Sequence, residues 1–122
     1  MARRLLLERR SFWSGLEGYV LTGELASVFN LPQPVGLLVQ RVAARSPAEL
    51  IGLRAGTMKA TIGGQTLVVG GDIILQVEGI PLSAENSYER IQERLSQLYP
   101  GAGVTITVLR EGHLVELKAS LP

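Results

Sequence analysis

Short apolar runs alternate with glycine- and proline-rich turns along the chain, a pattern typical of a small β-rich domain. Residues 37–42 predict one strand, and residues 72–77 are so continuously apolar that they predict a strand buried on both faces. Residues 104–108 and 114–119 flank Glu111-Gly112, which predicts a β-hairpin. A further strand is expected at residues 16–22.

A second hairpin is predicted at residues 57–69, where two strand-like runs meet at Gly63-Gly64. Consecutive glycines suit the positive backbone angles of a two-residue turn. We therefore expect two strands joined by a tight turn in this segment.

Helical periodicity is clearest at residues 87–98. The apolar positions of this segment form one stripe: Tyr88, Ile91, Leu95 and Leu98. Asn86 precedes the stripe and Glu89 follows three residues later, which is the spacing of a capping box. Pro100-Gly101 ends the segment.

Shorter helices are predicted elsewhere. Residues 1–11 and 24–29 have helical spacing, and Ser46-Pro47 is a helix start with serine as N-cap and proline in the first turn. Gly52 closes that last helix. The whole pattern predicts an α+β domain, a small antiparallel sandwich or partial barrel with two or three helices.

Composition narrows the class of protein. A chain of 122 residues with 46% hydrophobic residues and a net charge of +1 is expected to form one globular domain without a nucleic-acid-binding signature. It has no cysteine, which excludes disulfides and thiol chemistry. Arginines surround Leu5-Leu6-Leu7 near the start, but this apolar run is too short to insert into a membrane.

Catalytic and metal chemistry have little support. A serine-histidine-aspartate arrangement would need the single histidine, His113, and the single aspartate, Asp72, and both lie beside glycine turns. We interpret His113 as a surface residue and Asp72 as a structural acid. No ligand spacing for a metal is present, and no cofactor is expected.

Three segments in order resemble the PDZ domains of HtrA-like, trypsin-like bacterial serine proteases. They are residues 39–56 (VQRVAARSPAELIGLRAG), residues 70–79 (GGDIILQVEG) and residues 100–112 (PGAGVTITVLREG). Residues 12–32 resemble the segment that precedes them in the protease-associated subtype. Ser14 departs from the larger apolar residue that is usual there.

The resemblance implies a protease-type permuted strand order, with residues 12–122 as the PDZ domain and residues 1–11 as the remnant of a linker helix. Relative to shorter PDZ domains, the hairpin at residues 57–69 is an extra one. It also implies a parent protein that is a serine protease of protein quality control, in the periplasm or another extracytoplasmic space. The domain itself is expected to be non-catalytic and to bind C-terminal peptide tails by β-strand addition.

The resemblance places the peptide site in three segments. The loop for the peptide carboxylate is Trp13, Ser14, Gly15 and Leu16. The pairing strand is Glu17, Gly18, Tyr19 and Val20. The groove helix contributes Tyr88, Ile91, Gln92 and Leu95. Gly15 would let several backbone N–H groups converge on one anion.

Several assignments remain open. Trp13 is equally compatible with a core position and with a role in anchoring the loop. Gly18 could either leave room beside the ligand or mark a β-bulge. The helix could turn Ile91 and Leu95 to the core and Gln92 and Ser96 to the peptide. The pocket is expected to be apolar in either case, so that Leu16→Arg should abolish binding of tails with apolar last residues.

The main alternative is a structural or assembly domain. In that hypothesis the groove is filled by the chain itself or by a neighbour, and Leu5-Leu6-Leu7 is the candidate filler. Self-association that disappears when residues 1–10 are removed would favour it. The protease domain of the parent chain is a further expected partner.

Overall fold

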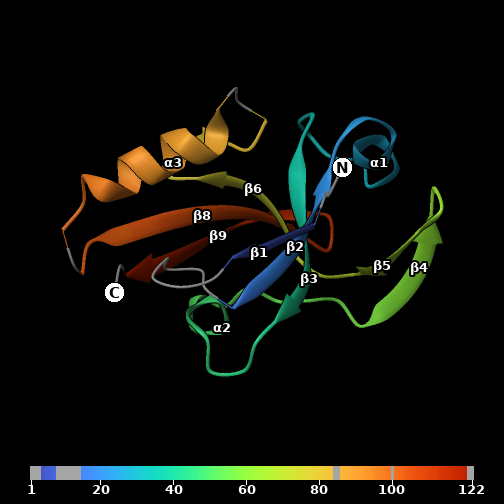
Figure 1. The fold of residues 1–122 in the computed structure, drawn as a ribbon, viewed down its shortest axis with the longest axis horizontal. Coiled ribbons are helices and arrows are strands. Elements are labelled where there is room, and N and C mark those ends of the chain that lie inside the picture. The colour runs from blue at the N-terminus through green and yellow to red at the C-terminus, as the bar shows by residue number, and fades with distance from the viewer. Residues whose placement is uncertain (1–3, 8–14, 84–85, 100, 121–122) are drawn as a thin grey trace.

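The computed structural model describes residues 4–7 (backbone only), 15–83, 86–99 and 101–120. Its main feature is a seven-stranded antiparallel sheet, with a separate two-stranded hairpin and three helices (Figure 1). The strands of the sheet are β1 Arg4–Leu7, β2 Leu16–Leu21, β3 Gly36–Val42, β6 Ile73–Val77, β7 Ile80–Pro81, β8 Gly103–Arg110 and β9 His113–Ser120. The hairpin is β4 Met58–Ile62 and β5 Gln65–Val69, and the helices are α1 Gly23–Val28, α2 Pro47–Ile51 and α3 Ser87–Ser96.

The strands follow the order β1-β2-β3-β6-β8-β9, and β7 pairs with β6. In the described part of the chain this is an open sheet, not a closed barrel, because β1 and β9 form its two ends. The predicted class, an antiparallel α+β domain with few helices, is confirmed. β6 is buried on both faces, as its continuous apolar sequence predicts.

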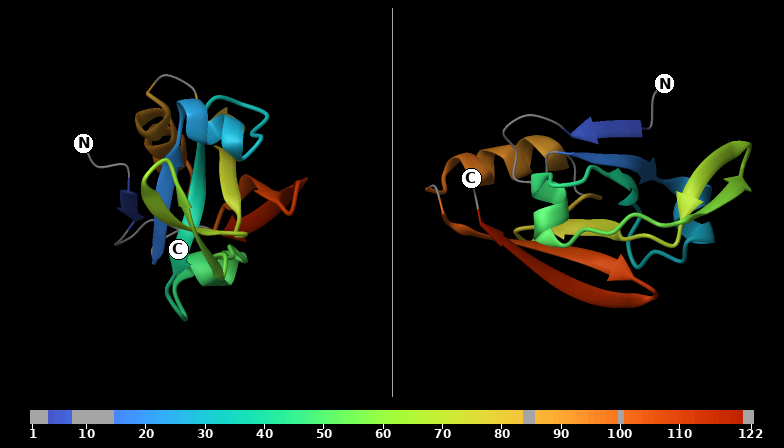
Figure 2. Two further views of the ribbon diagram at one scale, coloured as in Figure 1. Left: turned by 90° about the vertical axis from the view of Figure 1, so that its right-hand side faces the viewer. Right: turned by 90° about the horizontal axis from the view of Figure 1, so that it is seen from below.

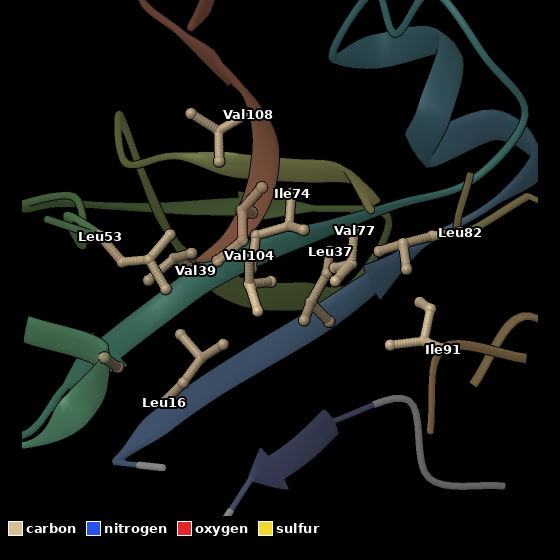
Figure 3. Packing of buried hydrophobic residues seen from close by; sticks show 12 residues of the cluster. Leu16, Leu37, Val39, Leu53, Ile74, Val77, Leu82, Ile91, Val104 and Val108 are labelled. Atoms are coloured by element: carbon tan, nitrogen blue, oxygen red, sulfur yellow. The ribbon is translucent and has the colours of Figure 1, made fainter. Parts of the chain in front are cut away.

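Two apolar clusters pack on opposite faces of the sheet. The first core contains Leu16, Leu37, Val77 and Ile91 among its buried members, and Figure 3 shows their side chains spread between Leu16 at one end and Ile91 at the other. The second core lies on the other face and is built around Tyr19, Leu21, Leu38, Leu67, Ile73 and Leu75. Residues of α1 and of β5 belong to it. Both faces of the central strands are therefore covered, which excludes water from their backbone.

Two predicted turns form as expected. Gly63 and Gly64 have φ of 58° and 81°, and Glu111 and Gly112 have φ of 51° and 80°. Two consecutive positive φ angles match the twist of a tight hairpin. The predicted extra hairpin at residues 57–69 is thus confirmed as β4 and β5.

Helix capping was predicted correctly for α2 and incorrectly for α3. In α2 the Glu49 backbone N–H donates to Ser46 Oγ at 3.3 Å, and Gly52 closes the helix at φ 101°. At α3, Asn86 is the N-cap but has φ of 56°, and its side chain makes no capping bond. Ser87 instead donates to the Leu82 carbonyl at 3.2 Å.

The prediction of a helix at residues 1–11 is wrong for residues 4–7. These residues form β1, which pairs antiparallel with β2. A run as short as Leu5-Leu6-Leu7 cannot distinguish a helix from a strand by its period. The edge of β2 supplies hydrogen-bonding partners that an isolated short helix would lack.

Candidate functional site

Strand β2 carries side chains into both cores. Leu16, Gly18 and Val20 lie on the face of the first core, whereas Tyr19 and Leu21 belong to the second core. Leu16 is fully buried and Tyr19 is 7% exposed. Side chains on both faces fix the strand in place, so that another strand can pair with it only along a backbone edge.

Gly15 belongs to the predicted carboxylate loop and lies immediately before β2. It has φ of +92°, and a Cβ at this position would lie 2.2 Å from the Cβ of Ser46. The Ala43 N–H donates to the Gly15 carbonyl at 2.9 Å, and Ser46 Oγ donates to the Ala43 carbonyl at 2.7 Å. Only glycine fits this backbone position, as the sequence suggested. Trp13 and Ser14 lie outside the described residues.

Ala43 and Ser46 are supporting residues that the sequence analysis missed. It identified Ser46 as the N-cap of a helix, but nothing in its local sequence indicates a contact with Gly15. The two are brought together because β2 and β3 pair antiparallel, with Leu16 opposite Val42. The segment that follows β3 therefore lies against the start of β2.

Gly18 lies at a crowded position and beside a β-bulge. A Cβ on Gly18 would lie 2.6 Å from Cγ of Leu37, whose side chain is fully buried. The β2–β3 register shifts between Glu17 and Gly18, so that Gln40 of β3 has no opposite partner. Of the two alternatives left open by the sequence, the bulge is present.

Helix α3 turns its apolar stripe toward the first core. Ile91 is 1% exposed and belongs to that core, and Tyr88 and Leu95 are half-buried against it. Gln92 and Ser96 are exposed. Of the two helix orientations considered, the structure has Ile91 and Leu95 on the core side.

Burial raises the pKa of Tyr88 to about 12. Because the folded value exceeds the ordinary value of about 10, the folded state keeps the phenol proton that the unfolded state loses between these limits. The free energy of unfolding is therefore unaffected by this group below about pH 10 and falls as the pH rises toward about 12. We expect Tyr88→Phe to flatten this alkaline decline in denaturation midpoint. An equal decline in both proteins would contradict the assignment.

Asp72 is a structural acid, as the sequence suggested. Its carboxylate is 1% exposed and accepts from Arg110 Nε and Nη2, both at 2.7 Å. The Arg54 backbone N–H donates to it at 2.9 Å, and Arg110 also donates to the Gly52 carbonyl at 2.8 Å. This pairing raises the pKa of Arg110. The Asp72 carboxylate is therefore paired with Arg110, whereas His113 is exposed at the start of β9.

The described residues contain no group of three or more histidine, aspartate or glutamate side chains that could hold a metal ion. None of the helices described is long and apolar enough to cross a membrane.

The outer edge of β2 is paired with β1. The register places Arg4 opposite Tyr19, Leu5 opposite Gly18, Leu6 opposite Glu17 and Leu7 opposite Leu16. The left view of Figure 2 shows β1 beside β2, on the side away from β3. This edge is where the resemblance places an incoming peptide.

A hollow lies elsewhere, on the face of the second core. It is lined by Phe29, Leu38, Ile73 and Leu109, together with the turn at Glu111-Gly112. These residues come from the end of α1, from β3 and β6, and from the β8–β9 hairpin. The hollow is therefore separate from the edge of β2, and none of the predicted site residues lines it.

The known proteins that this chain resembles in the comparisons below are serine proteases or HtrA-type proteases. The chain is 28% identical over 107 residues to the periplasmic pH-dependent serine endoprotease DegQ of Escherichia coli K12, covering 88% of this chain and 20% of that protein. It is 29% identical over 107 residues to a probable periplasmic serine protease do/HhoA-like of Haemophilus influenzae, covering 88% and 19%. A solved structure of the HtrA-type protease AlgW with a decapeptide is 26% identical, with a TM-score of 0.51, covering 98% of this chain and 30% of that one.

The chain thus spans about a fifth of the length of these curated relatives. The profile of the PDZ domain matches residues 14–121, which is most of the chain. That match includes β2, α3 and every strand between them and β9. On this match the chain belongs to the PDZ domain family.

Proposed function

We propose that this domain binds the C-terminal tails of peptides or proteins by β-strand addition to the outer edge of β2. The observation that carries the proposal is the β1–β2 pairing, in which the outer edge of β2 pairs with an antiparallel strand. The AlgW structure, described as containing a decapeptide, supports a peptide as ligand in a similar fold.

The proposed roles follow the order of the segments. Backbone N–H groups of Trp13, Ser14, Gly15 and Leu16 hold the peptide carboxylate, without need for a charged side chain. Glu17 to Val20 pair with the peptide backbone. On α3, Tyr88 and Leu95 line the wall, and Gln92 contacts the peptide from the exposed side of the helix.

An apolar last residue is the preferred ligand end. In an antiparallel pair, opposite residues place their side chains on the same face. A peptide residue opposite Leu16 therefore lies on the face of the first core, which is apolar. Ile91 is buried within that core.

The domain acts in this proposal as a non-catalytic module of a longer, periplasmic, HtrA-like serine protease. The names of the relatives support both the compartment and the protease. In the parent protein the module would present substrate tails to the protease domain or relay a regulatory signal from them.

A second candidate function is that of a structural or assembly domain with its site self-occupied. The same β1–β2 pairing favours it, because β2 already has a neighbour on both sides. Such a domain would not respond to peptides at all.

Amide NMR titration separates the two candidates. The probe is a short peptide with an apolar last residue and a free carboxylate, compared with its C-terminally amidated twin. We expect shifts from Gly15 to Val20 and along Tyr88 to Leu95 with the acid, and much weaker shifts with the amide. Absence of shifts with a varied set of such acids, in the whole chain and in a variant lacking residues 1–10, would overturn the peptide-binding proposal.

A further inference from the structure

The site is already occupied by a strand of the same chain. β2 pairs with β3 on one side and with β1 on the other, so the edge proposed for the peptide is covered. Within the described residues, β1 is an end strand whose sheet neighbour is β2 alone. Loss of β1 would therefore expose the edge of β2 while leaving the rest of the strand order intact.

The direction of β1 matches that required of a ligand. A peptide whose carboxylate lies at the Gly15 loop must place its last residue near Leu16 and its earlier residues toward Tyr19. β1 runs in this sense, with Leu7 opposite Leu16 and Arg4 opposite Tyr19. It therefore takes the register positions of the last four residues of a bound tail.

The chain lacks one feature of a true ligand at this point. Leu7 is followed by Glu8, so the residue opposite Leu16 carries a peptide bond and no terminal carboxylate. β1 can provide backbone pairing but has no terminal carboxylate beside Leu7. A free tail has that terminal carboxylate, and hydrogen bonds to a charged group are among the stronger ones.

We infer that β1 is a tethered mimic of the ligand, which holds the site closed until a tail with a free carboxylate displaces it. This inference rests on the proposed peptide-binding function. A strand joined to its site by a short connection acts at an effective concentration of roughly millimolar. The apparent affinity for a free peptide is reduced by the fraction of molecules in which β1 is released. The sequence of β1 also defines the preferred ligand, an extended tail ending in several apolar residues.

The test compares the whole chain with a variant lacking residues 1–10, which keeps the loop from Trp13 to Leu16. The probe is the synthetic peptide Ala-Arg-Arg-Leu-Leu-Leu with a free carboxylate, which repeats residues 2–7. Its control is the reversed sequence, which has the same composition but ends in Arg-Arg-Ala. We expect the truncated domain to bind the probe about tenfold more tightly than the whole chain does, with little binding of the reversed peptide.

A full-length variant covers the case in which the truncated domain does not fold. Alternate residues of an antiparallel strand donate to a given neighbour, so proline at both Leu5 and Leu6 removes a donor toward β2 whichever of them provides it. Leu5→Pro/Leu6→Pro should therefore raise the affinity as truncation does. Leu5→Ala/Leu6→Ala keeps the backbone donors and should raise it less.

Amide hydrogen exchange provides a direct readout of displacement. Peptide binding to the whole chain should accelerate exchange in β1 while leaving β2 protected, because one strand replaces the other. Equal affinities in the whole chain, the truncated domain and the proline variant, with unchanged exchange in β1, would overturn this inference and leave peptide binding intact. Failure of every variant to bind the probe or any other acid-ended peptide would overturn both.

Discussion

Asp72→Ala is expected to lower the free energy of unfolding by about 3 kcal/mol. The substitution leaves the Arg110 guanidinium, whose side chain is 17% exposed, without its anion. It also leaves the Arg54 backbone N–H without an acceptor. Removing one partner of a buried ion pair costs more than the pair itself contributes, because an uncompensated charge remains. Urea unfolding followed by tryptophan fluorescence measures the loss.

Two further variants test this explanation. Asp72→Ala combined with Arg110→Met should lose less stability than Asp72→Ala alone, since no partly buried cation is left behind. Glu93→Ala, at an exposed acid on α3, should change stability by no more than about 0.5 kcal/mol. If Asp72→Ala were as mild as Glu93→Ala, the carboxylate would not join β6, β8 and the α2–β4 connection as its hydrogen bonds suggest.

Elements with local chemical signals were predictable from the sequence. The start of α2 is marked by Ser46-Pro47 and its end by Gly52. The two hairpin turns are marked by residues that favour positive φ angles, Gly63-Gly64 and Glu111-Gly112. Each of these features is decided by residues adjacent in the chain. The family resemblance extended this to the PDZ fold as a whole, because its motifs depend on order and spacing rather than on contacts.

Features decided by distant contacts were not predictable. Leu5-Leu6-Leu7 becomes a strand because of the edge of β2, not because of its own period. Gln40 appeared as an ordinary strand residue, yet its side-chain amide both donates to and accepts from the backbone of Val68, at 2.8 and 2.9 Å. This pair of bonds attaches the β4–β5 hairpin to the bulge in β3.

The structure also changes the choice of mutation for the site. Leu16→Arg was expected from the sequence to block the peptide pocket. Leu16 is fully buried in the first core, so an arginine there would place a charge among apolar side chains and destabilise the whole domain. Loss of binding would then follow from unfolding and would say nothing about the pocket.

Gly15→Ala is the better test of the loop, with an expected loss of at least about tenfold in affinity for acid-ended peptides. At φ +92°, a Cβ would lie 2.2 Å from the Cβ of Ser46, so either the loop or the start of α2 must move. Hydrogen bonds to a charged group contribute about 1.5–3 kcal/mol each, which makes the carboxylate sensitive to small displacements of the loop. Isothermal titration with the acid peptide and with its amidated twin measures the effect.

Gly63→Ala provides a matched control for Gly15→Ala. Gly63 also has a positive φ, of 58°, but a Cβ there would meet nothing within 4 Å. This change should cost about 1 kcal/mol of stability through backbone strain and leave peptide affinity unchanged. Gly15→Ala should instead reduce acid binding more than amide binding, so that the two peptides become nearly equal. If both glycine variants weakened the acid and the amide to the same small extent, the residues beside Gly15 would not hold the carboxylate, and affinity would come from strand pairing alone.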